Sequence, residues 1–428
     1  MDRNTARSVL LAQKAEIEKK YQNRDYIQRE AYVTGEQLLK SGLIIVVLGV
    51  RRCGKSTLCL QLLRDKKYAY VNFDDERFYG VSTGDLDTIL ELLYEVYGDF
   101  EHLLLDEAQN VPGWELFVNR LQRQGLKILV TGSNAKLLGK ELATHLTGRH
   151  VSLELFPFSY AEFLQYRKTD QKERPQIAED LGKSKNELKE YMEKGGFPEA
   201  YLFPDPARYL RDLYDSIVSK DIVGRHKIRN TNTLREIVTY MVSNYASPLT
   251  YKKIKNVFEI KSKHTIKNYA AYAEESYLVI QLPNFSYKIK EQIRMPRKTY
   301  AIDTGLIKAI GITSTENTGR LMENIAAIEL MRRKGEAGTE LYYWKDYAGN
   351  ETDFITKKGT KVTEIIQVCH NLSDEKTKKR EIKGLIAASK DLRCDELMII
   401  TWDEEGVEEH AGKKVKMVPM WKWLMEEM

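Results

Sequence analysis

The chain has 428 residues, of which 42% are hydrophobic and 30% charged, and its formal net charge is +5 at pH 7. This length predicts about two to four domains, and the composition is typical of a globular protein. No apolar run approaches the roughly 18 residues of a membrane span, so we expect no membrane partner. Four cysteines without paired spacing predict a reducing compartment, no disulfide framework and no zinc site; we therefore expect a cytoplasmic location.

The N-terminal segment predicts a charged amphipathic helix. Residues 1–22 contain neither a long apolar core nor a small-residue cleavage site, so we do not expect a secretory signal. Breaks near FPDP and near the polar stretch ITSTENT mark further boundaries. The expected domains are residues 1–30, 31–203, 204–312 and 313–428.

Residues 49–56 read Gly-Val-Arg-Arg-Cys-Gly-Lys-Ser and fit the phosphate-loop pattern G-x-x-x-x-G-K-[ST]. The apolar run before them predicts a buried strand, and STLCLQLL after them predicts a helix. In such a loop, backbone N–H groups and a helix N-terminus surround a phosphate. Lys55 is expected to reach the β- and γ-phosphates, and Ser56 to ligate Mg²⁺. The predicted nucleotide-binding residues are Gly49, Val50, Arg51, Arg52, Cys53, Gly54, Lys55, Ser56 and Thr57.

A strand at 68–73 and a helical run near 86–97 lead to His102-Leu-Leu-Leu-Asp-Glu107. An apolar strand that ends in two carboxylates is the Walker B arrangement that a phosphate-loop enzyme needs. Asp106 is expected to hold Mg²⁺ through water, and Glu107 to polarise the water that attacks the γ-phosphate. The sequence has no Asn-Lys-x-Asp run to read guanine, which argues against GTP.

Two further residues are candidates for catalysis. A strand at 127–130 leads into Thr131-Gly-Ser-Asn134, where a polar residue beside Walker B can sense the γ-phosphate. We favour Asn134 as this sensor, with Ser133 second and an ordinary strand-to-helix turn as the alternative. Arg149 precedes another strand and is a candidate arginine finger for a neighbouring subunit; a surface or nucleic-acid-binding arginine is the alternative.

Strands that alternate with helices predict a parallel sheet covered on both faces. Four ordered blocks resemble the prokaryotic AAA-type ATPase family over roughly residues 30–200: GVRRCGKSTL, HLLLDEAQNVPGWE, LVTGSNAKLL and LTGRHVSLELFPFSYAEF. The resemblance implies a P-loop core of the additional-strand type and adenine as the base. It places the chemistry on Lys55, Ser56, Asp106 and Glu107.

The middle of the chain predicts a winged helix-turn-helix, in which a third helix enters the DNA major groove and a hairpin touches the backbone. We expect a helix at 207–223, followed by the three helices of this module at 233–244, 250–258 and 262–278. Paired strands are expected at 279–282 and 298–302. Between residues 220 and 300, 16 Lys and Arg stand against 6 Asp and Glu. This excess favours double-stranded DNA or another polyanion as partner, and a solvated helix face is the alternative.

The candidate DNA contacts are polar side chains of the third helix and of the basic loop SYKIKEQIRMPRK. They are Lys261, Lys263, His264, Lys267 and Asn268 on the helix, and Lys288, Lys290, Arg294 and Arg297 in the wing. Lysines of this kind contact phosphates and carry little base information. A module that packs on the ATPase or contacts protein is the alternative.

The last third of the chain resembles the restriction-endonuclease-like fold. A helix at 323–334 and strands at 340–344, 351–355 and 363–369 carry the acidic pattern, with Glu323, Asp353 and Gln367 in the matching positions. In the active version such groups hold one or two divalent metals and orient a water toward a phosphodiester. A helix at 375–391 and a strand at 397–402 are expected to complete the domain.

One position departs from the nuclease pattern. Cys369 stands where the active version has a lysine, and a neutral thiol supplies no cation for the attacking hydroxide or the leaving phosphate. Lys357, Lys358 and Lys361 are nearby candidates to replace it. The pattern therefore favours a retired nuclease fold used for binding or assembly over residual cleavage.

These patterns predict an α/β multidomain protein with a P-loop AAA-type parallel sheet, a winged helix-turn-helix middle domain and a restriction-endonuclease-like C-terminal domain. The expected activity is Mg²⁺-dependent ATP hydrolysis, coupled to domain movement and to a nucleic-acid or protein partner. The alternatives are a nucleotide-gated DNA-binding regulator with little turnover, an ATP-regulated metal-dependent nuclease and a protein-interaction scaffold. A homo-oligomer is expected if Arg149 acts in trans.

Overall fold

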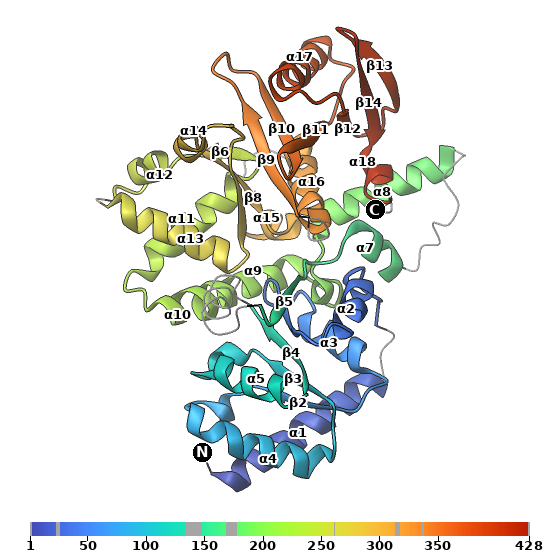
Figure 1. Ribbon diagram of the computed structural model, residues 1–428. Coiled ribbons are helices and arrows are strands. Elements are labelled where there is room, and N and C mark those ends of the chain that lie inside the picture. The colour runs from blue at the N-terminus through green and yellow to red at the C-terminus, as the bar shows by residue number, and fades with distance from the viewer. Residues whose placement is uncertain are drawn as a thin grey trace. The chain divides into compact units, whose positions relative to one another are not determined.

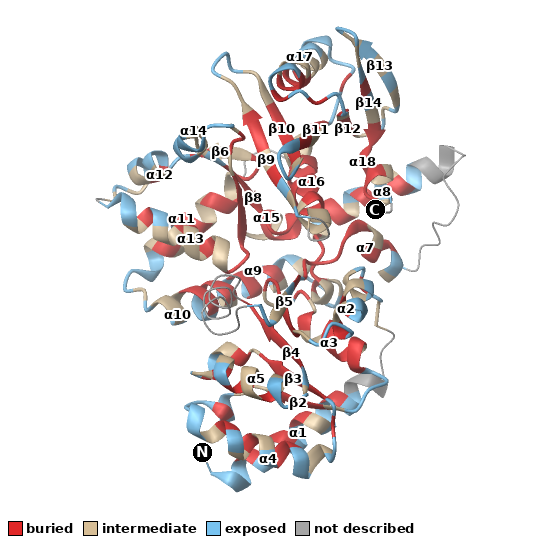
Figure 2. Cartoon of the chain, viewed as in Figure 1, coloured by how far each residue is buried: buried red, intermediate tan, exposed pale blue. Residues whose placement is uncertain are grey.

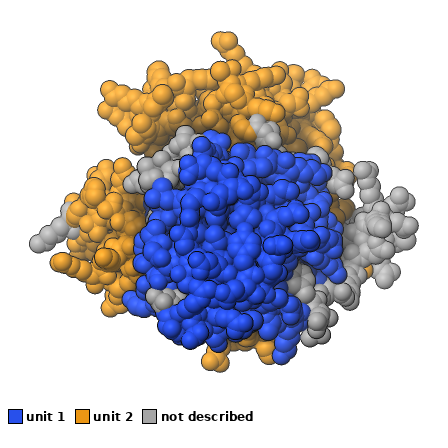
Figure 3. All heavy atoms as spheres, turned by 60° about the horizontal axis from the view of Figure 1, so that its bottom comes forward, with its two compact units in different colours: residues 1–156, 275–277 blue, residues 157–274, 278–428 orange. Residues whose placement is uncertain are grey.

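The computed structural model describes residues 2–22, 26–133, 148–167, 178–260, 262–312, 317–334 and 338–426. The chain divides into two compact units, residues 1–156 with 275–277 and residues 157–274 with 278–428, which Figure 3 shows in different colours. Within the described ranges, no helix is long and apolar enough to cross a membrane.

The first unit is built on a parallel five-stranded sheet (Figure 1). Its strands are β1 (Ile44–Leu48), β2 (Tyr68–Asn72), β3 (His102–Asp106), β4 (Lys127–Gly132) and β5 (His150–Glu154), in the order β2-β3-β4-β1-β5. All residues of β1 and β3 are buried, as apolar strands are when helices cover both faces of a sheet. The structure confirms the predicted parallel sheet, and β4 is the additional strand between β1 and β3.

Helices that precede the first strand or connect later strands cover this sheet. They are α1 (Arg3–Gln22), α2 (Ala31–Leu39), α3 (Lys55–Leu63), α4 (Leu86–Tyr97) and α5 (Trp114–Arg123). The apolar stripe of α1 buries Ala6, Val9, Leu10 and Ile17 at helical spacing and packs on α4 and β2. Figure 2 shows this burial on α1, with exposed residues on its other side. The predicted amphipathic N-terminal helix is therefore present.

The first part of the second unit is mostly helical. It contains α7 (Tyr160–Tyr166), α8 (Ala178–Lys194), α9 (Pro206–Ser216), a π-helical turn (Ile217–Val223), α10 (Gly224–His226), α11 (Thr231–Ser243), α12 (Tyr251–Val257), α13 (Lys263–Glu275), α14 (Ile289–Arg294) and α15 (Thr304–Ile310). Side-chain caps begin several of these helices; Thr250, for example, accepts the N–H of Lys253 at the start of α12.

A small antiparallel sheet accompanies α11, α12 and α13. Its strands β6 (Ser247–Leu249), β7 (Val279–Leu282) and β8 (Arg297–Ala301) stand in the order β6-β8-β7. The pairing of β7 with β8 agrees with the predicted hairpin. Sequence reasoning missed β6, which is short and contains a proline that only an edge strand tolerates. It also missed α14, which lies inside the expected basic loop.

The C-terminal part of the second unit has a mixed six-stranded sheet. Its strands are β9 (Thr339–Lys345), β10 (Glu351–Lys358), β11 (Lys361–Cys369), β12 (Leu397–Thr401), β13 (Gly406–His410) and β14 (Lys413–Pro419), in the order β13-β14-β12-β11-β10-β9. The pairs of β11 with β12 and of β12 with β14 are parallel, and the others are antiparallel. The helices are α16 (Thr318–Lys334), α17 (Glu375–Leu392) and α18 (Met420–Trp423).

Backbone hydrogen bonds join the two parts of the second unit. The N–H of Phe285 donates to Tyr343 O at 2.7 Å, and the N–H of Tyr343 donates to Pro283 O at 3.1 Å. Phe285 also belongs to the apolar cluster that contains Trp344 and Ile355 of the C-terminal sheet. The segment after β7 is therefore part of the same packed body as the C-terminal domain.

Candidate nucleotide site and charged clusters

The phosphate loop joins the end of β1 to the start of α3 and needs glycine at two places. Gly49 has φ +153°, and a Cβ there would lie 2.1 Å from Leu155 O. Gly54 has φ +102° and stands directly before α3, where a Cβ would lie 3.0 Å from Arg29 Nη1. Both positions would strain with any side chain, because L-residues rarely adopt these φ values and the neighbours leave no room.

Lys55 begins α3 with a side chain that turns back over its own loop. Its Nζ donates to Gly49 O at 3.0 Å and to Val50 O at 3.1 Å, and it lies 3.9 Å from Glu107 Oε1. The side chain is only 5% exposed. A buried ammonium held by two carbonyls is poised to exchange these contacts for phosphate oxygens.

Arg29 supports the loop from beneath and was not found from the sequence. It is buried, and its guanidinium donates to Cys53 O and to Phe156 O, both at 2.7 Å. It fixes the loop backbone by binding two of its neighbouring carbonyl oxygens. Burial raises the pKa of the Cys53 thiol, which keeps it neutral and gives it no catalytic part.

The Walker B aspartate ends β3 and receives two hydroxyl hydrogen bonds. Tyr70 Oη on β2 donates to Asp106 Oδ2 at 3.0 Å, and Thr131 Oγ1 at the end of β4 donates to Asp106 Oδ1. Burial and the charge of Asp106 raise the pKa of Tyr70 well above its usual value, so Tyr70 stays a donor. Because β2 and β4 flank β3 in the sheet, both strands orient the same carboxylate.

Glu107 stands immediately after β3 in a left-handed conformation, with φ 51°, which is uncommon for a residue with a side chain. Its N–H donates to Thr131 Oγ1 at 3.1 Å, its carboxylate accepts from Gln109 Nε2, and Ser133 Oγ donates to Glu107 Oε2 at 3.3 Å. The structure thus brings Ser133, the second choice of sensor, to the expected base. Asn134, the first choice, lies outside the described residues.

Arg149 lies at the end of the sheet opposite the phosphate loop, beside the start of β1. Its carbonyl accepts the N–H of Ile44 at 2.9 Å, at the start of β1, whereas the loop follows the end of that strand. Its guanidinium is exposed and donates to Asn119 Oδ1 at 2.6 Å. The structure therefore does not bring Arg149 to the phosphate loop of its own chain.

These residues fit a triphosphate with its magnesium ion. The loop has the glycines and the strand-to-helix position of a phosphate loop, Lys55 supplies a buried cation, and Asp106 supplies a carboxylate. Ser56, in the first turn of α3, brings a hydroxyl to the same end of the sheet. The donor set is oxygen-rich, as Mg²⁺ prefers.

Four of the candidate DNA contacts are exposed cations of the second unit. Lys263 and Lys267 lie on α13, and Lys290 and Arg294 lie on α14. Within the described part of the chain, none of these four forms an ion pair with a carboxylate. Two other candidates are paired, Lys288 with Glu291 and Arg297 with Glu274. Lys261 lies outside the described residues.

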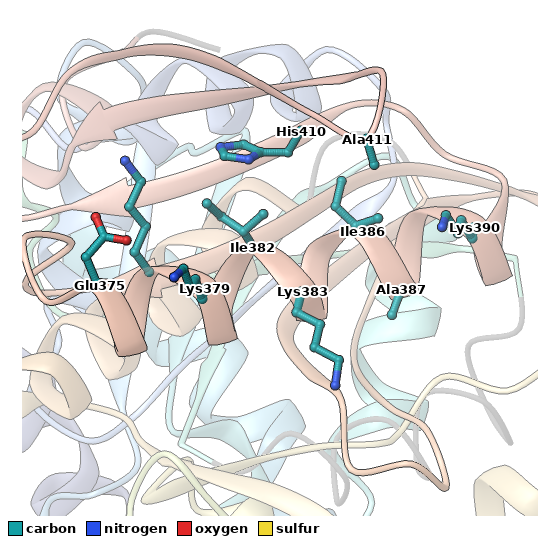
Figure 4. A pocket seen from close by; sticks show the side chains of 10 residues that line it. Glu375, Lys379, Ile382, Lys383, Ile386, Ala387, Lys390, His410 and Ala411 are labelled. Atoms are coloured by element: carbon teal, nitrogen blue, oxygen red, sulfur yellow. The ribbon is translucent and has the colours of Figure 1, made fainter.

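A further basic surface runs along α17. A hollow of about 670 Å³ lies between this helix and the turn after β13, and its lining includes Lys379, Lys383 and Lys390. Figure 4 shows Ile382 and Ile386 pointing from α17 toward the strand of His410, while Lys383 points away from it. Sequence reasoning expected the helix but gave this surface no role.

The acids of the nuclease-like pattern meet a lysine that the sequence did not indicate. Glu323 of α16 and Asp353 of β10 both contact Lys298 Nζ, at 2.8 and 2.7 Å. Gln367 of β11 contacts other groups: its Oε1 accepts the N–H of Asp353 at 3.1 Å, and its Nε2 donates to Glu381 at 2.8 Å.

The lysines proposed to replace the missing nuclease lysine lie elsewhere. Lys357 pairs with Glu340 at 2.6 Å, and Lys358 and Lys361 are exposed at the turn between β10 and β11. Burial raises the pKa of Cys369 to about 11, so its thiol stays neutral. The cation beside the acids is Lys298 instead. It was missed because β8 lies far from the acids in the sequence.

Three family models match successive parts of the chain. They are an AAA domain over residues 41–164, a domain of unknown function (DUF8612) over residues 185–316 and another (DUF4143) over residues 318–423. The fold, the phosphate loop and the Walker B carboxylates define the first unit as an AAA-type P-loop nucleotide-binding domain.

Whole-length relatives place the chain in a family. It is 36% identical to an uncharacterized protein of Methanocaldococcus jannaschii over 396 residues, which covers 89% of this chain and 88% of that protein. It is 31% identical to an uncharacterized protein of Haemophilus influenzae over 358 residues, which covers 78% of this chain and 85% of that protein. The chain belongs to this prokaryotic family of AAA-type ATPases.

Solved structures show weaker likeness. The Walker-type ATPase PABY2304 of Pyrococcus abyssi has 15% identity and a TM-score of 0.43, over 67% of this chain and 97% of that chain. The replication initiator DnaA, bound to AMPPCP and single-stranded DNA, has 18% identity and a TM-score of 0.27, over 58% of this chain and 90% of that chain. Both scores are low, so neither likeness bears on what this chain binds.

Proposed function

We propose that this protein is a Mg²⁺-dependent ATPase whose chemistry is carried out by Lys55, Asp106 and Glu107. The observation that carries the proposal is that a buried lysine at the start of α3 lies close to the expected general base, which follows β3. Lys55 Nζ and Glu107 Oε1 are 3.9 Å apart at the carboxyl edge of the parallel sheet, where open α/β sheets bind ligands.

Each residue has a separate part in this reaction. The loop N–H groups and Lys55 bind the phosphates and offset the charge that develops on the γ-phosphoryl oxygens. Glu107 orients a water and accepts its proton as the water attacks phosphorus, and Ser133 and Gln109 hold that carboxylate. Ser56 and Asp106 would hold Mg²⁺, which would neutralise part of the phosphate charge.

The proposed partner is a nucleic acid, bound by the second unit. Support comes from the exposed cations Lys263, Lys267, Lys290 and Arg294, which make no ion pair within the described residues. Further support is the order of α11, α12 and α13 followed by paired strands, which is the order expected of a winged helix-turn-helix, in which the third helix and the wing face DNA. Phosphate contacts of this kind give affinity with little sequence preference.

We also propose that the protein forms a homo-oligomer in which Arg149 acts on the nucleotide of a neighbouring copy. Since its position keeps it from the nucleotide of its own chain, a catalytic part requires a neighbouring copy. Mixing Arg149→Ala chains with Glu107→Gln chains tests this. Activity that exceeds the sum of the two inactive preparations supports action in trans.

Phosphate release from ATP, measured with and without duplex DNA, tests the whole proposal. Turnover that vanishes in Glu107→Gln supports the ATPase, and stimulation by DNA joins the two units into one mechanism. ATP binding without turnover would point to a nucleotide-gated regulator. Turnover that DNA leaves unchanged would separate the ATPase from the proposed partner.

A further inference from the structure

A buried lysine stands among three carboxylates in the second unit. Lys298 Nζ lies 2.7 Å from Asp353 Oδ1, 2.8 Å from Glu323 Oε1 and 3.1 Å from Glu351 Oε1. The lysine side chain is 3% exposed. It comes from β8, whereas the acids come from α16 and β10 of the C-terminal domain. A cation of this chain therefore occupies the space between these acids.

Other hydrogen bonds hold two of the acids in place without the lysine. Asp353 Oδ2 accepts the backbone N–H of Val368 at 3.0 Å, and Tyr300 Oη donates to Glu323 Oε1 at 2.8 Å. The N–H of Asp353 donates in turn to the Gln367 side chain at 3.1 Å. Asp353 and Glu323 would therefore each keep a hydrogen-bond donor if the ammonium were removed.

Two lysines offset the charge of the three acids in this cluster. Lys345 forms a second ion pair with Glu351, at 2.8 Å. Burial and the charge of Asp353 raise the pKa of Glu323 to about 7. Burial lowers the pKa of Lys298, but the surrounding acids outweigh it and raise that pKa well above its usual value. Lys298 is therefore a permanent cation, and its loss would leave buried carboxylates without compensation.

A divalent metal ion would need the space that the ammonium occupies between these oxygens. Carboxylate oxygens around one point are the ligands that Mg²⁺ takes, at about 2.0–2.1 Å. The distances to the ammonium are longer, and within the described ranges no group of three or more His, Cys, Asp or Glu side chains could hold a metal ion in its present arrangement. A metal ion would thus need the lysine to leave and the acids to move inward by roughly 1 Å.

We propose that Lys298 Nζ is an internal cation that keeps a divalent-metal site closed, and that Mg²⁺ or Mn²⁺ binds Glu323, Glu351 and Asp353 once this ammonium is removed. In the intact protein the lysine fastens β8 to α16 and β10, and the cluster takes no metal ion. The acids then serve to join two parts of the second unit, and metal-dependent phosphodiester cleavage is not available to them.

Mn²⁺ binding to the nucleotide-free full chain tests this proposal. The binding is measured from the electron paramagnetic resonance signal of free Mn²⁺. Every variant carries Asp106→Asn, which removes the expected metal ligand at the phosphate loop. Lys298→Ala is expected to bind Mn²⁺ at least about tenfold more tightly than the chain that keeps Lys298. Adding Asp353→Asn to Lys298→Ala is expected to remove this binding.

Lys345→Ala is the matched control, because Lys345 pairs with Glu351 but its side chain is 36% exposed. It is expected to leave Mn²⁺ binding at the level of the parent chain. Two results would overturn the proposal: equal Mn²⁺ affinity with and without Lys298, or a Lys298→Ala chain that keeps its native circular dichroism and binds no Mn²⁺.

A stability cycle decides the question if Lys298→Ala folds poorly. Lys298→Met is made in the parent chain and in a chain that carries Glu323→Gln and Asp353→Asn. It is expected to lower the urea midpoint strongly in the parent and several-fold less in the neutralised chain, because the uncompensated acids are gone. Equal losses in both backgrounds would show that Lys298 is not the counter-ion of these acids.

Discussion

Lys55 Nζ lies 3.9 Å from Glu107 Oε1, so the cation that is to hold phosphate and the carboxylate that is to activate water face the same space. Lys55→Ala is expected to weaken ATP binding roughly tenfold to a hundredfold, because hydrogen bonds to charged groups contribute about 1.5–3 kcal/mol. Glu107→Gln is expected to bind ATP as tightly as the parent chain. Titration with a fluorescent ATP analogue measures both, and equal binding by Lys55→Ala would contradict the assignment.

Tyr70 is expected to position the magnesium ligand without touching the nucleotide. Its hydroxyl donates to Asp106 at 3.0 Å, so Tyr70→Phe removes one of the two hydroxyl donors that orient this carboxylate. The Mg²⁺ concentration for half-maximal ATPase rate should rise, and the rate should recover at high Mg²⁺. Tyr68→Phe, in the same strand, is the control and should leave the Mg²⁺ dependence unchanged. A loss of rate that Mg²⁺ does not repair would assign Tyr70 a different role.

Gly49 is expected to tolerate no side chain. In Gly49→Ala the new Cβ would lie 2.1 Å from Leu155 O at φ +153°, so β1, β5 or the loop must shift. We expect a loss of at least about 2 kcal/mol in the free energy of unfolding, together with loss of ATP binding. Gly42→Ala is the matched control, because Gly42 has φ +69° but no atom near its Cβ position. Similar urea midpoints for the two variants would refute the close contact.

The stability of the second unit should depend on pH through Glu323. Burial and the charge of Asp353 raise the pKa of Glu323 to about 7 from its usual 4.5. Between these two values the folded chain holds a proton that the unfolded chain releases, so this group makes stability fall as pH rises. Glu323→Gln is expected to flatten the fall in urea midpoint between pH 5 and pH 7 relative to the parent chain. An unchanged slope would mean that Glu323 titrates normally.

Nucleic-acid binding is expected to depend on the exposed cations of α13 and α14. Each phosphate contact that is lost should lower the slope of log affinity against log salt by about one. Lys263→Ala with Lys267→Ala, and Lys290→Ala with Arg294→Ala, should therefore weaken retention on duplex DNA and reduce its salt dependence. Lys66→Ala, an exposed lysine of the first unit, is the control. Retention equal to the parent chain in both double variants would direct attention to the lysines of α17.

The sequence predicted the elements that depend on local pattern. The apolar runs that became β1 and β3 and the loop between β1 and α3 are contiguous in the chain, so residues 49–56 could be assigned from spacing alone. The carboxylates of Asp106 and Glu107 follow the same logic, since each parallel strand delivers its C-terminal residues to one edge.

The supporting contacts could not be predicted in this way. Arg29 reaches Cys53 and Phe156 through the fold, and neither distance follows from a motif. The same is true of Lys298, which meets Asp353 because β8 packs beside the C-terminal sheet. From the sequence alone, a lysine in a basic segment is expected to be exposed. Its burial becomes clear only when the fold shows the acids that surround it.

The most direct test of the central claim is the steady-state rate of phosphate release from ATP and Mg²⁺ by the full chain and by Glu107→Gln. We expect sustained turnover by the full chain and a fall of about 10²–10⁴ in rate in Glu107→Gln, with ATP binding retained. A full chain that binds ATP but releases no phosphate, or a Glu107→Gln chain that turns over at the parent rate, would contradict it.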